Sequence, residues 1–427
     1  MSRYRVVRGL LIGLAILAGL VMATSLSVLA YGGWRLRAAS ARFEREVGPL
    51  NLLGFARPRI PDERNAVTWL RPGVLAMVLF GSDRSLVGTL ASKTSSEWTP
   101  KDVTDFEPLA ERNEPGRQIL ERARGLTESN WNIPYENGNA AKLPDLLAAM
   151  NAGKLVAAHG RLAMRRGDRA TALTDAETLG ALARSHQRES ATIVLLIGAA
   201  LERIQLGLVK ELVTDPGIGP AELDRLDAAL SDVDLGRAFQ VALRGESAAL
   251  VHDIVESDSF SKEMPRVVPR SLVIGLSKLA VAAALESRYP IVPSLVAPIT
   301  SPITDPAEGY NSRSWWQRIA EGYNPNLRST FARGTGTMSA RQLARLAIVL
   351  RRDALASGSY PAAFTTPVDP LTGAPYALEP KAGGIELRST TTPEILQSIY
   401  PIGPALNAQL YAWSLPPSGS RSSTRSR

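Results

Sequence analysis

The feature that most constrains this chain is an apolar run without any charged residue over residues 9–34, GLLIGLAILAGLVMATSLSVLAYGGW. A helix needs about 20 apolar residues to cross the hydrocarbon core of a bilayer, so this run can span it with some tilt. Arginines flank the run on both sides, and Tyr31 and Trp34 stand at its end, where amphipathic rings prefer the membrane–water interface. The sequence therefore predicts a single-pass transmembrane anchor that places 9–34 in the lipid bilayer.

The sequence leaves open whether the segment 9–34 is cleaved and on which side of the membrane the large domain lies. A cleavable signal peptide has an apolar core of about 7–15 residues, shorter than this run, although Val28-Leu29-Ala30 resembles a cleavage site. The positive-inside rule gives little indication of orientation, because the numbers of arginines on the two sides of the run are nearly equal. The tail 1–8 is basic, short and free of acids, so we expect it to stay in the cytoplasm. The large domain is then expected in the periplasm, held by the inner (cytoplasmic) membrane.

The net charge of +8 does not indicate a nucleic-acid partner. The whole excess lies in residues 1–8, 35–46 and 416–427, so that 47–415 is neutral. A groove for phosphates needs a local excess of Lys and Arg, which this neutral part lacks. The chain has no cysteine, which excludes disulfides, thiol nucleophiles and cysteine-ligated metal sites, and it has only three histidines. We therefore expect no nucleic acid, no cofactor and no metal.

The predicted fold class is mainly α: a transmembrane helix, an antiparallel helical stack, and a small C-terminal α+β segment with a β-hairpin. The predicted segments are a basic cytoplasmic tail (1–8), the anchor (9–34), a stalk with irregular short helices (35–139), a helical domain (140–288), a Pro-rich connector (289–337), an α+β segment (338–415) and a disordered basic tail (416–427). Only short helices are expected in 35–139, since prolines are expected to interrupt long ones at Pro58, Pro61, Pro72, Pro100, Pro108, Pro115 and Pro134.

Apolar residues at helical spacing predict the helices of the domain 140–288. They are expected near 146–165, 172–183, 190–213, 221–231, 235–257 and 269–288. The last of these, 269–288, is a weak candidate for a second membrane span, because its apolar part Ser271–Leu285 is short and carries Lys278 at its centre. We interpret it as a buried or amphipathic helix.

One turn in this domain has a recognisable pattern, LAMRRGDRATAL over residues 162–173. It resembles the turn of a tetratricopeptide-type helical hairpin, in which Gly tolerates the left-handed helix end and Asp caps the next helix. A solenoid needs several repeats, and no second copy occurs at a 34-residue period. The alternatives of a repeat fold and an ordinary helical hairpin stay open.

The C-terminal residues 338–389 carry a second pattern. A predicted helix over about 339–356 leads to Gly358-Ser359-Tyr360-Pro361, then to Asp369-Pro370 and Pro375-Tyr376, and finally to two short segments that can pair as a hairpin, Tyr376–Leu378 and Ile385–Leu387. This resembles the periplasmic part of type II secretion major pseudopilins. The chain lacks the Gly-Phe-Thr-Leu-x-Glu processing site of a pilin, so the resemblance implies an exported segment and not a pilin subunit.

Candidate chemical sites in the sequence are few. Glu246, His252, Asp253 and Glu256 lie near one face of a predicted helix and suggest a carboxylate metal site, but a solvated helix face is the simpler interpretation. His159 and His186 are interpreted as structural histidines. Gly334-Thr335-Gly336-Thr337 is predicted to form a Gly-rich turn without the Lys that a phosphate loop needs, and Trp315-Trp316 to form a packing anchor or a binding platform.

No hydrolase elbow, phosphate loop or dinucleotide fingerprint occurs in the sequence. We therefore expect a membrane-anchored exported protein whose helical region binds or scaffolds other proteins. The alternative is a membrane-tethered enzyme, hydrolase-like, whose polar residues converge only in three dimensions. A deep polar pocket with clustered carboxylates would favour the enzyme, and an apolar groove between helices would favour the binding protein. Catalytic residues are unknown from the sequence.

Overall fold

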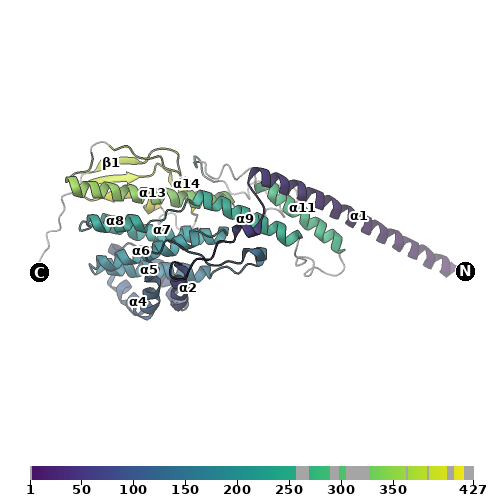
Figure 1. The fold of residues 1–427 in the computed structure, drawn as a ribbon, viewed down its shortest axis with the longest axis horizontal. Coiled ribbons are helices and arrows are strands. Elements are labelled where there is room, and N and C mark those ends of the chain that lie inside the picture. The colour runs from purple at the N-terminus through teal and green to yellow at the C-terminus, as the bar shows by residue number, and fades with distance from the viewer. Residues whose placement is uncertain are drawn as a thin grey trace.

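The computed structural model describes residues 2–255, 269–288, 298–303, 327–361, 364–381, 384–401 and 408–417. In these ranges the chain is mostly helical, with a three-stranded antiparallel sheet near the C-terminus (Figure 1). This confirms the mainly α fold class. Glu256, Trp315, Trp316 and the tail beyond 417 lie outside the described residues, as does most of the predicted connector.

The helices are α1 (Ser2–Glu46), α2 (Val67–Ala76), α3 (Gly81–Leu90), α4 (Pro100–Glu121), α5 (Leu146–Arg165), α6 (Arg169–Gln187), α7 (Thr192–Thr214), α8 (Pro220–Ala229), α9 (Leu235–Val255), α11 (Arg270–Arg288), α13 (Leu327–Ser357) and α14 (Pro393–Ile399). Short 3-10 turns are η1 (Leu52–Phe55), η2 (Ser95–Glu97), η3 (Tyr135–Ala140) and η6 (Gln409–Tyr411). The strands are β1 (Ala377–Lys381), β2 (Gly384–Arg388) and β3 (Ala412–Leu415).

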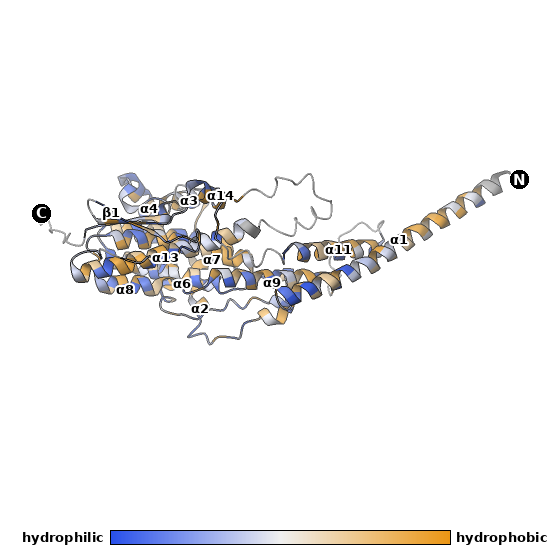
Figure 2. Ribbon diagram, turned by 90° about the horizontal axis from the view of Figure 1, so that it is seen from above, coloured by the Kyte–Doolittle hydropathy of each residue, from blue (hydrophilic) through white to orange (hydrophobic). Residues whose placement is uncertain are grey.

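The predicted anchor and stalk form one continuous helix, α1. Its apolar side chains between Leu10 and Trp34 are largely exposed, and in Figure 2 the N-terminal part of α1 projects beyond the rest of the protein. Helix α1 is long and apolar enough to cross a membrane. By length and composition α7 also qualifies, but 61% of its apolar window is buried in the protein, so it is a core helix.

Helix α11 packs along the second half of α1. The buried residues of α1 on this side are Ser25, Gly32, Leu36, Ala39 and Phe43, spaced by seven, four, three and four residues as in a coiled-coil seam. At Gly32 the two backbones are so close that a Cβ would lie 2.4 Å from the carbonyl oxygen of Gly275. Small residues permit this approach, and the interpretation of 269–288 as a packed helix is confirmed.

The expectation that prolines would restrict 35–139 to short helices is wrong for α4. This helix has 22 residues and includes Pro108 and Pro115. Both prolines are exposed, as are Thr104 and Glu111, whose carbonyls lose their usual amide donors. Water can hydrate these carbonyls, while the opposite face buries Phe106, Leu109 and Leu120. Burial of this opposite face therefore holds α4 together although each proline removes one backbone hydrogen bond.

Helices α5, α6 and α7 pack side by side at the centre of the protein (Figure 1). The turn between α5 and α6 has the predicted chemistry: Gly167 has φ +77°, and Asp168 caps α6 by accepting a hydrogen bond from the Thr171 amide at 3.1 Å. Ala172 and Leu173 are buried against the core. The local hairpin is thus as predicted.

Helix α13 begins 12 residues before its predicted start near Ser339 and includes Gly334 to Thr337. The prediction of a Gly-rich turn there is therefore wrong. The glycines serve close packing: a Cβ on Gly334 would lie 2.6 Å from the Phe239 ring, and one on Gly336 would lie 2.5 Å from the Tyr400 hydroxyl. Tertiary contact thus overrides the weak helix propensity of Gly.

The C-terminal sheet has the strand order β1-β2-β3. The predicted hairpin is confirmed by the pairing of Leu378 with Leu387, and β3, which was not predicted, pairs with β2. Gly358, with φ +79°, ends α13 as expected. The Asp-Pro turn is built around buried Asp369, which accepts a hydrogen bond from the Leu371 amide at 2.8 Å and another from the Ser389 hydroxyl.

Candidate functional site

The described carboxylates of the cluster predicted on α9, Glu246 and Asp253, are held by two different segments of the chain. Glu246 accepts a hydrogen bond from the Thr192 amide at 3.1 Å, and Asp253 accepts one from the Asn139 side chain at 2.7 Å. These carboxylates therefore hold neighbouring segments onto α9. Over the described ranges, no group of three His, Asp or Glu side chains could hold a metal ion.

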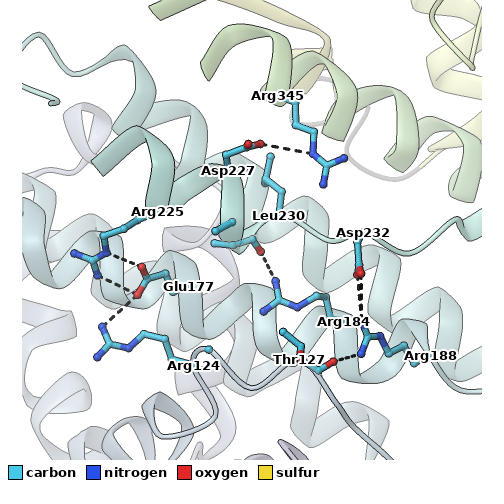
Figure 3. A pocket seen from close by; sticks show the side chains of 13 residues that line it. Arg124, Thr127, Glu177, Arg184, Arg188, Arg225, Asp227, Leu230, Asp232 and Arg345 are labelled. Atoms are coloured by element: carbon cyan, nitrogen blue, oxygen red, sulfur yellow. Dashed lines mark hydrogen bonds and ion pairs between the residues drawn. The ribbon is translucent and has the colours of Figure 1, made fainter. Parts of the chain in front are cut away.

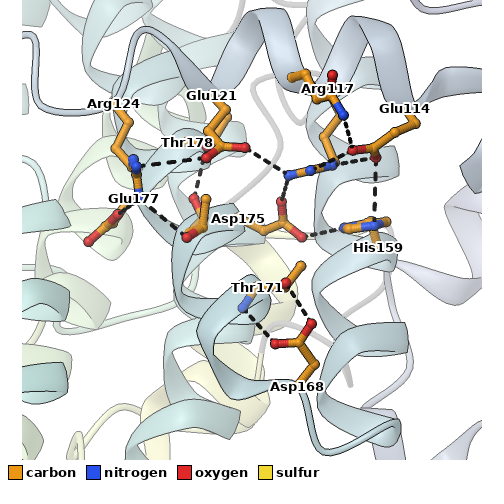
Figure 4. A network of polar contacts seen from close by, with 12 residues as sticks. Glu114, Arg117, Glu121, Arg124, His159, Asp168, Thr171, Asp175, Glu177 and Thr178 are labelled. Atoms are coloured by element: carbon orange, nitrogen blue, oxygen red, sulfur yellow. Dashed lines mark hydrogen bonds and ion pairs between the residues drawn. The ribbon is translucent and has the colours of Figure 1, made fainter.

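His159 lies in a polar network between α4, α5 and α6 (Figure 4). Its Nδ1 lies 2.6 Å from Oδ2 of the fully buried Asp175, whose Oδ1 accepts a hydrogen bond from Arg117 at 3.1 Å. Arg117 also makes two hydrogen bonds to Glu114, at 2.7 and 2.8 Å. Burial raises the pKa of Asp175, while His159 and Arg117 oppose that shift. The network joins three helices, in agreement with a structural His159.

His186 is fully buried on α6, where its ring packs against Trp131 with the centroids 4.8 Å apart. Its Nδ1 lies 2.9 Å from the Leu182 carbonyl oxygen, and its Nε2 has no protein hydrogen-bond partner in the described part of the chain. Burial lowers the pKa of His186 to about 4. The ring is therefore neutral at pH 7 and acts as a core residue, as predicted.

A groove of about 660 Å³ lies between α5 and α7, and we take it as the candidate functional site. The turns η2 and η6 border it. Its apolar walls are formed by half-buried Met150, Met164, Ala200 and Ile204, together with Leu410. Since Met150 and Met164 are 14 residues apart on one helix, the groove is about 20 Å long. It is therefore long enough for about six extended residues of a peptide.

The acidic side chains of the groove are already paired within the protein. Glu211 accepts hydrogen bonds from Arg161 Nε and from the Ser95 amide, both at 2.7 Å. Asp215 accepts one from the Gly217 amide at 2.7 Å and lies 3.4 Å from Arg169. These carboxylates therefore hold the walls in place and offer little to a positively charged ligand.

Two cations of the groove are, in contrast, without a carboxylate partner in the described ranges. Lys154 on α5 makes no ion pair there, and Arg203 on α7 stacks over the Tyr400 ring at 3.7 Å, with its Nε lacking a protein hydrogen-bond partner. A third cation, Lys210, closes the groove by donating to the Gln409 and Ala412 carbonyls, and burial lowers its pKa. The part of the groove around Lys154 and Arg203 is therefore positively charged and adjoins apolar walls.

Neither Lys154 nor Arg203 is recognisable as a site residue from the sequence. Each is a single basic residue on an amphipathic helix, which is typical of a solvated position. Only the packing of α5 against α7, with Gly153 facing Leu201, brings the two cations to the same level of the groove.

No known protein family, curated protein or solved structure matches this chain. The groove and its charges are therefore the basis for a functional proposal.

Proposed function

We propose that this chain is a membrane-anchored binding protein whose α5–α7 groove receives an apolar, acidic peptide segment of a partner protein. The apolar walls beside Lys154 and Arg203, two cations without carboxylate partners in the described ranges, carry this proposal. An acidic side chain of the partner would pair with these cations while its apolar side chains bury against Met150 and Ile204.

A peptide suits the groove better than a hydrocarbon chain. The wall over residues 92–96 presents the hydroxyls of Ser92, Thr94 and Ser96. Ser92 donates to the Thr89 carbonyl at 2.6 Å, and Thr94 donates to Glu97 at 2.9 Å and lies 3.0 Å from the Ser96 hydroxyl. The oxygens keep lone pairs that water can reach, and a hydrocarbon chain would cover these without replacing the lost hydrogen bonds. The backbone of a peptide offers donors and acceptors to them. The occupant we propose is therefore a protein segment.

Selection from a random peptide library on the full-length chain in nanodiscs tests this proposal. We expect selected sequences to combine apolar residues with Asp or Glu. The variant Lys154→Glu, alone or with Arg203→Gln, should weaken their binding by about tenfold or more, since hydrogen bonds to a charged partner contribute about 1.5–3 kcal/mol.

The matched control is Lys101→Glu on α4, because the Lys101 side chain is 80% exposed and lies outside the groove. Equal loss in this control and in Lys154→Glu would contradict the proposal. Recovery of a bound fatty acid that depends on Lys154, with no peptide selected, would also contradict it and make the groove a lipid site.

We further propose that the helical domain is exported and that α1 crosses the inner membrane once. The short basic tail 1–8 and the pseudopilin-like segment 338–389 support this orientation. Alkaline phosphatase fused to the C-terminus of the full-length chain is expected to be active, and green fluorescent protein at the same place to be dark. Deletion of residues 9–34 should inactivate the phosphatase fusion. An inactive full-length phosphatase fusion with a fluorescent counterpart would place the domain in the cytoplasm.

A further inference from the structure

A second pocket, of about 860 Å³, is rich in arginine. It lies between the segment after α4, the second half of α6, the end of α8 and a residue of α13. Its charged residues are Arg124, Arg184, Arg188, Arg225, Arg345, Glu177, Asp227 and Asp232 (Figure 3). Five guanidinium groups therefore accompany three carboxylates, and the pocket lining carries two excess positive charges.

Four of these arginines have a carboxylate partner in the pocket. The pairs are Arg124–Glu177 at 3.2 Å, Arg225–Glu177 at 2.8 Å, Arg188–Asp232 at 3.2 Å and Arg345–Asp227 at 3.7 Å. Glu177 is shared by two arginines, and the last pair is too long for a hydrogen bond. The carboxylates therefore satisfy only part of the donor capacity of the pocket, and the Thr127 and Ser231 carbonyls each accept one further hydrogen bond, from Arg188 and Arg345.

Arg184 has no carboxylate partner among the described residues, although it lies in the middle of the lining (Figure 3). One of its terminal nitrogens donates to the Ala229 carbonyl at 2.6 Å. That carbonyl also accepts a hydrogen bond from Gln205 at 3.1 Å, so it would stay satisfied without Arg184. Burial and the like charge of Arg188 lower the pKa of Arg184, while the carboxylates of Asp232 and Glu202 oppose that shift. The guanidinium therefore keeps N–H donors that have no hydrogen-bond partner among the described residues.

We infer that this pocket binds a soluble phosphate monoester, with Arg184 as its central contact and Arg188 and Arg345 beside it. A phosphate monoester carries close to two negative charges at pH 7, which matches the two excess positive charges of the lining. Its oxygens accept paired hydrogen bonds from the planar guanidinium fork of Arg184. This inference uses a different site from the α5–α7 groove and does not depend on it.

The place of the pocket favours a soluble ligand over a lipid headgroup. Helix α8, which forms one wall, lies at the opposite end of the protein from the N-terminus of α1 (Figure 1). The bilayer that holds residues 9–34 is therefore far from Arg184, and a headgroup of that bilayer cannot enter the pocket.

Isothermal titration of the full-length chain in phosphatidylcholine nanodiscs with inorganic phosphate, pyrophosphate and glycerol 3-phosphate tests the inference. We expect saturable binding of the ester with one site per chain. Arg184→Gln should weaken it roughly tenfold to a hundredfold, and Arg184→Lys should restore only part of the loss, because Lys keeps the charge and loses the fork. Arg237→Gln, at an exposed arginine outside the pocket, should bind as the parent does.

Thermal unfolding separates binding from a structural role of Arg184. Without ligand, Arg184→Gln should unfold close to the temperature of the parent, since Arg184 makes no ion pair within 4 Å in the described ranges and the Ala229 carbonyl keeps its hydrogen bond from Gln205, and only the stabilisation by ligand should be lost. The inference is overturned if no ester binds below 1 mM, as an order-of-magnitude limit, or if Arg184→Gln and Arg237→Gln bind alike. Binding to vesicles that contain phosphatidic acid, without binding of the soluble esters, would also overturn it.

Discussion

Arg341→Met is expected to lower the free energy of unfolding by about 3–5 kcal/mol, the largest effect we predict for one side chain. Arg341 on α13 makes a two-pronged ion pair with Glu202 on α7, through Nε at 2.5 Å and a terminal nitrogen at 2.8 Å. The Glu202 side chain is fully buried, and that of Arg341 is 8% exposed. Removing the cation therefore leaves a buried carboxylate that keeps only its hydrogen bond from Gln187.

A second variant shows whether the cost arises from the unpaired charge. Arg341→Met combined with Glu202→Gln should recover most of the lost stability, because no buried charge remains. Arg352→Met is the control, since Arg352 and its partner Asp224 are 41% and 61% exposed and such surface pairs contribute about 0–1 kcal/mol. Pulse proteolysis in urea of the full chain in nanodiscs measures each value. A loss no larger than that of Arg352→Met would refute the prediction.

The second large effect is a loss of stability in acid caused by His186. Its pKa is about 4 in the folded protein, against about 6.5 in an unfolded chain. Between these values the unfolded chain binds a proton that the folded protein does not, so stability falls as the pH falls from 6.5 towards 4. At pH 4.5 the expected loss from this residue is about 2–3 kcal/mol relative to pH 7.5.

The same proteolysis measurement at pH 7.5 and pH 4.5 isolates this contribution when the parent is compared with His186→Gln. Gln stays neutral across this range and can still donate to the Leu182 carbonyl. The drop in stability on acidification should be smaller in the variant by the 2–3 kcal/mol expected of His186. Equal drops in both proteins would mean that His186 does not contribute to the acid sensitivity.

Much of the fold follows from local sequence patterns. The long apolar helix α1, the turn at Gly167-Asp168 and the end of α13 at Gly358 were predictable, because each depends on residues close together in the chain. Helix α4 shows the limit of local rules, since it continues through Pro108 and Pro115, which both lie on its exposed face. Strand β3 shows another limit: four residues carry too little periodicity to predict a partner for β2.

The residues of the two candidate sites could not be predicted from the sequence, for a related reason. Neither Arg184 nor Lys154 has a local signature, because the value of a charged side chain depends on which neighbours pair with it. Those neighbours come from segments that are distant in the chain, as Ala229 does for Arg184.

The sequence by itself therefore determined that the chain has an apolar helix able to hold it in a bilayer, that its surplus charge lies at its ends, and that the rest is mainly helical. These properties depend on composition and on spacing along the chain. Only the tertiary structure decided which arginines are paired and which are not, and that an apolar groove runs between α5 and α7. Charge pairing and burial are set by distances in space, and a residue's place in the chain does not fix them.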